Sequence, residues 1–393
     1  MPISRKIEGF LSKASFIRKM FEEGNRLKND GKGPVYDFSL GNPQLEPPSQ
    51  FKEVLLKTVQ SDESCTHLYM ENIGYEETRS AVAESLEQET GLPFTPGSVI
   101  MSVGASGAIN TALKAIIDPG DEVIITVPYF VEYLFYIDNH GGVPVKVNTT
   151  PDFNLDVSVI EKHINERTKV VIINNPNNPT GVIYPQSTLD DLGKMLKAKS
   201  SEIGHPVYLI DDAPYRKIIY DTDRCPSIFT AYENSIMVTS HSKDLGLPGE
   251  RIGFAAISPR TGDAAELFGA MAFTVRTLGY VNAPALMQRV VRHLQNTTID
   301  IEWYRRKRDL LYRELTGMGY EMPYPGGAFY VFPRAPGKDD VAFTRLMQEN
   351  RVLVVPGTGF GTPGYFRIAY CFDDSVVEGA LPIFRKAIEE SAK

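Results

Sequence analysis

The segment Ser235–Gly253, SIMVTSHSKDLGLPGERIG, joins an apolar run to a polar loop. The run is typical of a buried strand, and the loop holds two hydroxyls, an amine and a guanidinium within twelve residues: Ser240, Ser242, Lys243 and Arg251. Hydroxyls and a guanidinium suit an anion such as phosphate, because they donate several charge-assisted hydrogen bonds. A desolvated lysine beside them is nucleophilic toward a carbonyl. The segment therefore predicts a site that holds a phosphorylated aldehyde through a covalent imine.

Two other interpretations of Lys243 are open at this point. Most lysines are solvated surface charges, so a lone lysine is by default one of those. The stretch Ser240–Lys243 also fits the Ser-x-x-Lys pattern of acyl-transfer enzymes, with Ser240 as the nucleophile. That pattern needs Ser-Asp-Asn and Lys-Thr-Gly partners, which the chain lacks. Acyl transfer is therefore disfavoured.

Length and composition narrow the class of protein. The 393 residues are too many for one typical domain, and 42% hydrophobic with 23% charged residues are ordinary values for a globular protein. A net charge of −8 without a basic run argues against nucleic-acid binding. No segment resembles a membrane span or a signal peptide. The three cysteines, Cys65, Cys225 and Cys371, are scattered along the chain. This spacing predicts a reducing, cytoplasmic location and no metal site.

Apolar, mostly β-branched runs alternate with helical patterns through the middle of the chain. Seven of these runs are predicted strands: Ser98–Val103, Glu122–Val127, Val143–Val147, Lys169–Asn174, Val207–Ile210, Ser235–Thr239 and Gly253–Ile257. The alternation predicts an α/β fold with a mostly parallel seven-stranded sheet sandwiched by helices.

The two ends of the chain have a different pattern. The N-terminal segment predicts an amphipathic helix that ends near residues 29–31 and is followed by a short strand at Val35–Leu40. Its apolar residues recur at helical spacing: Ile7, Phe10, Leu11, Phe16, Ile17, Met20 and Phe21. A long helical stretch is predicted at Gln288–Thr316, followed by three short strands at Ala328–Phe332, Val352–Val355 and Tyr365–Tyr370 and then by a closing helix. We therefore predict a smaller α+β domain built from residues 1–48 and 291–393 beside a large domain at 49–290.

Segments with binding chemistry follow the predicted strands, at the edge where open α/β sheets bind ligands. After the first strand, Gly104–Gly107 opens a helix at about Ala108, and a helix N-terminus attracts anions. After the second strand, Tyr129 and Phe130 supply rings that could cover a flat heterocycle. Taken alone, a segment like the first is more often a plain turn, and such rings are at least as often ordinary core aromatics.

Amide and carboxylate groups follow two later strands. After the fourth strand, Asn175–Gly181 contains two Xaa-Pro steps, which keep the chain non-helical and could fix the Asn178 amide toward an oxyanion. After the fifth strand come Asp211 and Asp212, and a carboxylate at a strand end can keep a ring nitrogen protonated. A rigid turn and a helix cap are the alternatives for these two segments.

The set of strand-end segments resembles the class I/II aminotransferases, the aspartate-aminotransferase-like group of pyridoxal phosphate (PLP) enzymes of fold type I. The resemblance covers nearly the whole chain, and the Lys243 segment and Asn178–Gly181 are its most specific parts. Further matching segments are Ser39–Pro43, Tyr69 to Gly74 to Arg79, Pro325–Tyr330 and Phe366–Ile368.

This resemblance implies roles for three catalytic residues. Lys243 would form the aldimine with PLP and, once substrate releases it, transfer the proton. Asp212, in Asp-x-x-Tyr spacing with Tyr215, would keep the pyridine nitrogen protonated, and Asp211 is the neighbour that could be confused with it. Asn178 and Tyr215 would hydrogen-bond the phenolic oxygen of the ring.

The resemblance also implies how the phosphate is bound. Ser240 and Arg251 would hold it through their side chains, and Ser242 would assist. The backbone at Ala105 and Ser106 would complete the site. Some aspartate-specific relatives carry a lysine where this chain has Ser106, so preference for dicarboxylates by that route is not expected.

Ring stacking, substrate binding and assembly follow from the same resemblance. Phe130 occupies the position of the ring-stacking aromatic. Arg367 would clamp the substrate α-carboxylate, helped by the Gly41 amide and Asn178. Tyr69 matches a residue that reaches the phosphate of the neighbouring subunit, which implies a homodimer with shared active sites.

The predicted function is that of a PLP-dependent aminotransferase that moves an amino group between an L-amino acid and a 2-oxo acid by a ping-pong mechanism through Lys243. The alternative is a PLP-dependent lyase of the carbon–sulfur β-lyase type on the same scaffold. A non-enzymatic PLP-binding regulator is disfavoured, because the segment before Ser39 is neither long nor basic enough for a DNA-binding region. Arg276 is a candidate for a second acid-binding residue donated by a partner chain.

Overall fold

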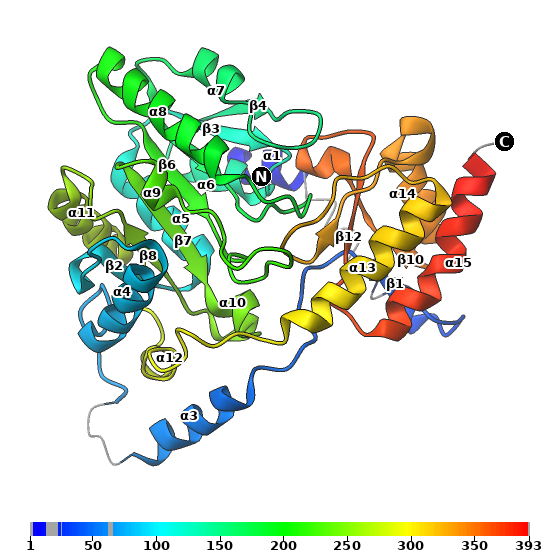
Figure 1. Cartoon of the computed structure of the whole chain (residues 1–393), viewed down its shortest axis with the longest axis horizontal. Helices are drawn as coiled ribbons and strands as arrows, with labels where there is room; N and C mark the ends of the chain where they lie inside the picture. Colours follow the sequence, from blue (N-terminus) through cyan, green and yellow to red (C-terminus); the bar gives the residue numbers. More distant parts are fainter. Residues whose placement is uncertain (1–2, 13–22, 25, 62–65, 392–393) are drawn as a thin grey trace.

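The computed structural model describes residues 3–12, 23–24, 26–61 and 66–391, and its centre is a seven-stranded sheet (Figure 1). In sheet order the strands are β2 (Val99–Ser102), β8 (Gly253–Ile257), β7 (Ser235–Ser240), β6 (Tyr208–Asp212), β5 (Thr168–Ile173), β3 (Glu122–Val127) and β4 (Val143–Asn148). Only β8 runs antiparallel to its neighbours in this sheet. The predicted fold class is confirmed, and each predicted strand of this sheet has its bounds within two residues.

Helices cover both faces of the sheet, which explains why every residue of β3 and β7 is buried. One face packs against α5 (Gly104–Ile116), α6 (Glu132–Asn139) and α11 (Ala264–Thr277). The other face packs against α4 (Glu76–Thr90), α7 (Val157–His163), α8 (Gln186–Ile203), α9 (Ile228–Ala231) and α12 (Ala285–Val291). The two layers bury the β-branched side chains that alternate along the strands.

Segments from the two ends of the chain lie together beside this sheet (Figure 1). Strand β1 (Tyr36–Asp37) pairs in parallel with β10 (Val352–Leu353), and an antiparallel sheet has the order β11 (Val355–Pro356), β12 (Phe366–Ala369), β9 (Tyr330–Val331). The adjoining helices are α13 (Ile301–Met318), α14 (Asp340–Glu349) and α15 (Asp374–Ser391). They share one core of buried aromatic and aliphatic side chains with β9, β10 and β12.

The remaining elements are short or connect these parts. They are helices α1 (Arg5–Ser12), α3 (Ser49–Gln60) and α10 (His241–Asp244), with 3₁₀ turns at Pro96–Ser98, Pro248–Glu250, Pro336–Lys338 and Gly357–Phe360. The described part of the chain has no helix long and apolar enough to cross a membrane, and no group of three or more His, Cys, Asp or Glu side chains placed to hold a metal ion.

The structure corrects two helix predictions. The continuous helix predicted at Gln288–Thr316 is wrong, because α12 ends at Val291 and α13 begins at Ile301. The Asp300 side chain accepts hydrogen bonds from two backbone N–H groups of the first turn of α13, and such an N-cap starts a new helix. Helix α5 begins at Gly104 and not near Ala108.

The predicted amphipathic helix near the N-terminus is found in part. Helix α1 covers Arg5–Ser12, and residues 26–29 are helical. The apolar positions between them, in 13–22, lie outside the described residues.

Candidate active site

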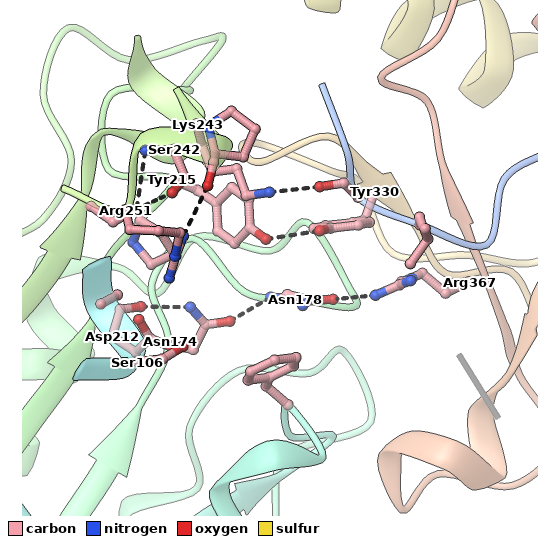
Figure 2. A pocket seen from close by; sticks show the side chains of 17 residues that line it. Ser106, Asn174, Asn178, Asp212, Tyr215, Ser242, Lys243, Arg251, Tyr330 and Arg367 are labelled. Carbon is pink, nitrogen blue, oxygen red and sulfur yellow. Dashed lines mark hydrogen bonds between the residues drawn. The ribbon is translucent and has the colours of Figure 1, made fainter. Parts of the chain in front are cut away.

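A cavity of about 270 Å³ lies where β6 and β7 end, facing the C-terminal strands (Figure 2). It brings together the predicted site residues other than Tyr69 and Arg276, the two expected to act from a partner chain: Gly41, Ala105, Ser106, Phe130, Asn178, Asp212, Tyr215, Ser240, Ser242, Lys243, Arg251 and Arg367. Residues separated by more than three hundred positions in the chain therefore line one cavity.

Tyr69 does not line this cavity, and its side chain is 88% exposed. Its predicted role is contact with the phosphate of a neighbouring subunit. A single chain does not test that role, so it stays a prediction.

Asp212 ends β6 with its carboxylate buried at the cavity wall. Tyr133 of α6 donates a hydrogen bond to Oδ2 at 2.6 Å, whereas Oδ1 has no hydrogen-bond partner among the described residues. Burial raises the pKa of Asp212 to about 6, and the Tyr133 hydrogen bond opposes part of that rise. A buried carboxylate oxygen without a donor is unfavourable. This wall of the cavity is therefore suited to a ligand that presents a cationic N–H group.

The neighbouring Asp211 is placed differently. Side chains of successive strand residues point to opposite faces, and Asp211 accepts a hydrogen bond from the backbone N–H of Asn175 and does not line the cavity. Burial raises the pKa of Asp211 well above its usual value, and repulsion from Asp212 is the second-largest cause of the rise. Geometry thus separates the two carboxylates that the sequence leaves adjacent.

Lys243 lies in the short helix α10, directly after β7. Its Nζ donates to the carbonyl oxygen of Gly41 at 2.6 Å and lies 5.6 Å from the centre of the Phe329 ring. The pKa of Lys243 is lowered to about 8, chiefly by burial and to a smaller extent by the positive charges of Arg251 and Arg367. The lower pKa increases the fraction of neutral amine near pH 7, and the neutral amine is the nucleophilic form.

The neighbourhood of Lys243 is also suited to an anion. The Ser240 side chain caps α10 by accepting from the Ser242 backbone, and the two hydroxyls are 2.6 Å apart. Helix α5 presents its N-terminal turn, with Ser106, to the same cavity. A Cβ at Gly104 would lie 2.6 Å from Nη2 of Arg251, so only glycine lets this guanidinium approach the helix end.

A chain of amide hydrogen bonds connects the sheet with the C-terminal strands (Figure 2). Asn174 donates to the Asp212 carbonyl and accepts from the Asn178 backbone, both at 2.6 Å. The Asn178 side-chain oxygen then accepts from Nη1 of Arg367 at 3.0 Å. Asn178 is therefore fixed from two sides.

Arg367 of β12 is 2% exposed, and its charge is held by aromatic rings and oxygen atoms. Nη2 donates to the Ser39 carbonyl at 2.6 Å, and Cζ lies 4.7 Å from the ring centre of Tyr330 and 4.9 Å from that of Phe360. Burial lowers its pKa, yet a guanidinium stays charged in proteins. Nε has no partner among the described residues. A buried guanidinium with donor capacity left over suits a carboxylate.

Three residues of this network were missed by the sequence analysis: Tyr133, Asn174 and Tyr330. Tyr133 stands three residues after Phe130, and such spacing predicts that the two side chains lie on one side of a helical turn. Asn174 was assigned to the end of a strand, and Tyr330 stands in a matching segment to which no role was given. Their roles depend on the hydrogen bonds that the fold brings together.

The family model for aminotransferase class I and II matches residues 34–382. The chain belongs to this family. A probable aspartate/prephenate aminotransferase from Thermus aquaticus is 34% identical over 359 residues, which cover 89% of this chain and 90% of that protein.

Solved structures agree with this assignment. An amino transferase from Eubacterium rectale has a TM-score of 0.96 and 39% identity, with both chains fully covered. An aspartate aminotransferase from Thermus thermophilus, solved with maleate, has a TM-score of 0.86 and 29% identity over 98% of this chain and 100% of that one. The protein is thus an aminotransferase, and the lyase alternative is not favoured.

Aminotransferases of this family use PLP, and the groups in the cavity fit that cofactor. The unpartnered Oδ1 of Asp212 suits a protonated pyridine nitrogen, and the Lys243 amine suits an aldehyde. The hydroxyls and the guanidinium near the start of α5 suit a phosphate.

Proposed function

We propose that this aminotransferase binds PLP in the cavity described above and that Lys243 bonds its aldehyde. Asp212 would face the ring nitrogen, and Asn178 and Tyr215 would face the phenolic oxygen. The observation that carries the proposal is the buried, unpartnered Oδ1 of Asp212, which shares its cavity with a lysine whose pKa is about 8.

The remaining contacts to the cofactor follow from the cavity lining. The phosphate would accept hydrogen bonds from Ser240, Ser242 and Arg251 and from the backbone of the first turn of α5, at Ala105 and Ser106. The ring of Phe130, which also lines the cavity, would stack on the pyridine ring.

Each residue would contribute to the transfer by binding, orienting or moving a proton. Bound PLP supplies an electron sink for the negative charge that develops on the substrate Cα. The carboxylate of Asp212 would keep the ring nitrogen protonated and so stabilise that charge. Arg367 would bind the substrate α-carboxylate, assisted by the Gly41 N–H and Asn178. The Lys243 amine would take the proton from Cα and donate it to the carbon of the former PLP aldehyde group.

The reaction would move an amino group between an L-amino acid and a 2-oxo acid in two half-reactions. Two relatives, an aspartate/prephenate aminotransferase and an aspartate aminotransferase, make aspartate the first amino donor to test. The buried guanidinium of Arg367 accounts for recognition of the α-carboxylate that all such substrates share.

Assembly, organisation and location are parts of the same proposal. The homodimer is supported by two neighbouring exposed side chains, Leu68 at 60% and Tyr69 at 88%, because a partner would cover them. We propose that residues 49–290 form the large domain and that residues 1–48 and 291–393 together form the small domain. The pairing of β1 with β10, which joins the two ends of the chain, supports this division. The scattered cysteines support a cytoplasmic location.

The cofactor proposal is tested by adding PLP to the purified protein and recording visible absorbance. Borohydride reduction followed by peptide mapping should place the cofactor on Lys243, and the Lys243→Ala protein should lack that adduct. An adduct on another lysine in both proteins would refute the assignment.

The reaction is tested by single-turnover conversion of the loaded protein with a panel of amino acids, beginning with aspartate. We expect pyridoxamine phosphate and the matching 2-oxo acid in equal amounts. Release of pyruvate and ammonia without pyridoxamine phosphate would instead show a lyase. Light scattering should give about twice the chain mass of 43.7 kDa.

A further inference from the structure

Tyr330 contacts groups on both sides of the cavity, and the proposed function gives it no role. It lies in β9 with 2% of its side chain exposed. Its hydroxyl is 2.8 Å from the hydroxyl of Tyr215, and its ring centre is 4.7 Å from Cζ of Arg367 (Figure 2). One side chain therefore joins the residue expected at the cofactor phenolic oxygen to the residue expected at the substrate carboxylate.

The fold holds Tyr330 tightly in this place. Ala369 of β12 is paired with Tyr330, so Arg367, two residues earlier, is its diagonal neighbour on the same face of the sheet. A Cβ at Gly41 would lie only 2.1 Å from the Tyr330 hydroxyl oxygen. The Tyr330 hydroxyl thus occupies the space that a side chain at position 41 would fill. The backbone of Gly41 lies directly against this hydroxyl and limits its movement.

The direction of the hydrogen bond between the two tyrosines decides what Tyr215 can do. Each hydroxyl carries one proton, and either oxygen can be the donor of the 2.8 Å contact. If Tyr215 donates to Tyr330, it has no proton for an acceptor in the cavity. If Tyr330 donates, the Tyr215 proton is free to point at such an acceptor, and donation polarises the Tyr215 O–H bond.

Arg367 favours the second arrangement. Its guanidinium lies over the face of the Tyr330 ring, and a positive charge there makes the Tyr330 hydroxyl a better proton donor. The guanidinium stacks on the rings of Tyr330 and Phe360 and not on that of Tyr215, which lies edge-on to Tyr330 with the two ring centres 5.5 Å apart. The charge therefore biases the pair toward donation by Tyr330.

We propose, on the basis of the PLP site described above, that Tyr330 is a positioning residue that donates to Tyr215, aims the Tyr215 proton at the cofactor phenolic oxygen, and ties this hydrogen bond to the carboxylate site through Arg367. The Tyr330 hydroxyl then acts only through Tyr215, and the Tyr330 ring acts on Arg367. The two parts of the side chain have separable effects.

The hydroxyl is tested with Tyr330→Phe, loaded with PLP, by titrating its visible absorbance against pH. A donor to the phenolic oxygen stabilises its anionic form, so a weaker Tyr215 donor should move the titration midpoint up by about 0.5–1 pH unit. KM for the amino acid should stay within about twofold, because the ring remains over Arg367. Tyr330→Leu, which also removes the ring, should raise KM about tenfold.

A double-mutant cycle tests whether Tyr330 acts through Tyr215. In the Tyr215→Phe background, adding Tyr330→Phe should leave the midpoint unchanged. The matched control is Tyr370→Phe, which removes another fully buried hydroxyl, one that donates to the Ala328 carbonyl outside the cavity lining. That control should leave the midpoint at the wild-type value.

Replacing Tyr330 by 3-fluorotyrosine gives an opposite test that hardly alters shape and so protects against loss of folding. The more acidic phenol donates more strongly, so the midpoint should move down. Wild-type titration in both Tyr330→Phe and the fluorinated protein would overturn the positioning role. Absence of visible absorbance in the wild-type protein would instead overturn the PLP site itself, so the two failures are distinguishable.

Discussion

The two walls of the cavity hold their charged groups in different ways. On the wall formed by the seven-stranded sheet, burial moves the pKa of Asp212 up to about 6 and that of Lys243 down to about 8, and one Asp212 oxygen has no donor among the described residues. On the wall formed by β9 and β12, Arg367 keeps its charge between two rings and two oxygen atoms. The sheet wall is adjustable by pH, whereas the other wall is a fixed cation. Mutations of Asp212 and Lys243 on the first wall should change chemistry and pH dependence, and mutations of Arg367 on the second should change affinity.

The largest effect should come from Asp212→Asn on the sheet wall. PLP should remain bound, but turnover should fall by about 10³-fold, because a neutral amide does not hold a proton on the ring nitrogen in the transition state. KM for the amino acid should change little, since Arg367 is untouched. Steady-state kinetics with the amino donor identified in the single-turnover panel measure both quantities.

Asp211→Asn is the matched control for that change. The Asp211 carboxyl lies on the other face of β6 and has a raised pKa, so replacing it by a neutral amide should lower turnover by less than about tenfold. If Asp211→Asn is the more damaging of the two, the proposed orientation of the cofactor is wrong.

Arg367→Lys should weaken substrate binding and leave cofactor absorbance unchanged. Lysine keeps the charge but loses the planar fork and its stacking between rings, so KM should rise about 100-fold, with a smaller change in kcat. Arg334→Lys serves as control, because Arg334 lies 5.4 Å from the Tyr365 ring centre, outside the cavity lining. An unchanged KM in Arg367→Lys would show that the α-carboxylate is bound elsewhere.

The fold and the cavity differ in how far the sequence alone predicts them. The buried strands can be predicted from the sequence because a strand covered on both faces must be mostly apolar, as in β3 (EVIITV). The break before α13 was missed because the charged residues around it suit an exposed helix as well as a loop, and only the Asp300 cap separates the two.

Partners of the site residues are harder to predict than the residues themselves. Asp212 and Lys243 stand out by residue type and position at a strand end. Tyr133 and Tyr330 are aromatic residues in apolar surroundings, so their sequence pattern is that of core. What distinguishes them is a hydroxyl that reaches Asp212 or Tyr215 from 79 or 115 residues away along the chain.

The lowered pKa of Lys243 predicts the pH dependence of cofactor capture. The neutral amine attacks the aldehyde, so the rate of covalent PLP binding by the apoenzyme should increase with pH. Below the pKa of Lys243 the rate should rise about tenfold for each pH unit, and it should level off near pH 8. Stopped-flow absorbance over pH 6–10 measures this profile. A rate that still rises tenfold per pH unit up to pH 10 would mean that the amine is solvated before the cofactor arrives.

The smallest effect should come from Tyr133→Phe, which removes the donor to Oδ2 of Asp212. In the folded protein the pKa of Asp212 lies above its ordinary value of 3.8, so its contribution to stability is full below pH 3.8 and is lost as pH rises toward 6. Without Tyr133 that pKa should rise further, and the loss should continue to higher pH. Urea unfolding of the apoenzyme at pH 5 and pH 8 should therefore show a difference larger by about 1 kcal/mol in the variant.

Tyr320→Phe separates this electrostatic effect from the simple loss of a buried hydroxyl. Tyr320 is 3% exposed and donates to the Phe384 carbonyl at 2.9 Å, where no carboxylate is involved. Its replacement should lower stability equally at both pH values, because the lost partner does not titrate. If Tyr133→Phe also lowers stability equally at pH 5 and pH 8, Tyr133 stabilises only packing, and the pH-adjustable character of the sheet wall rests on burial alone.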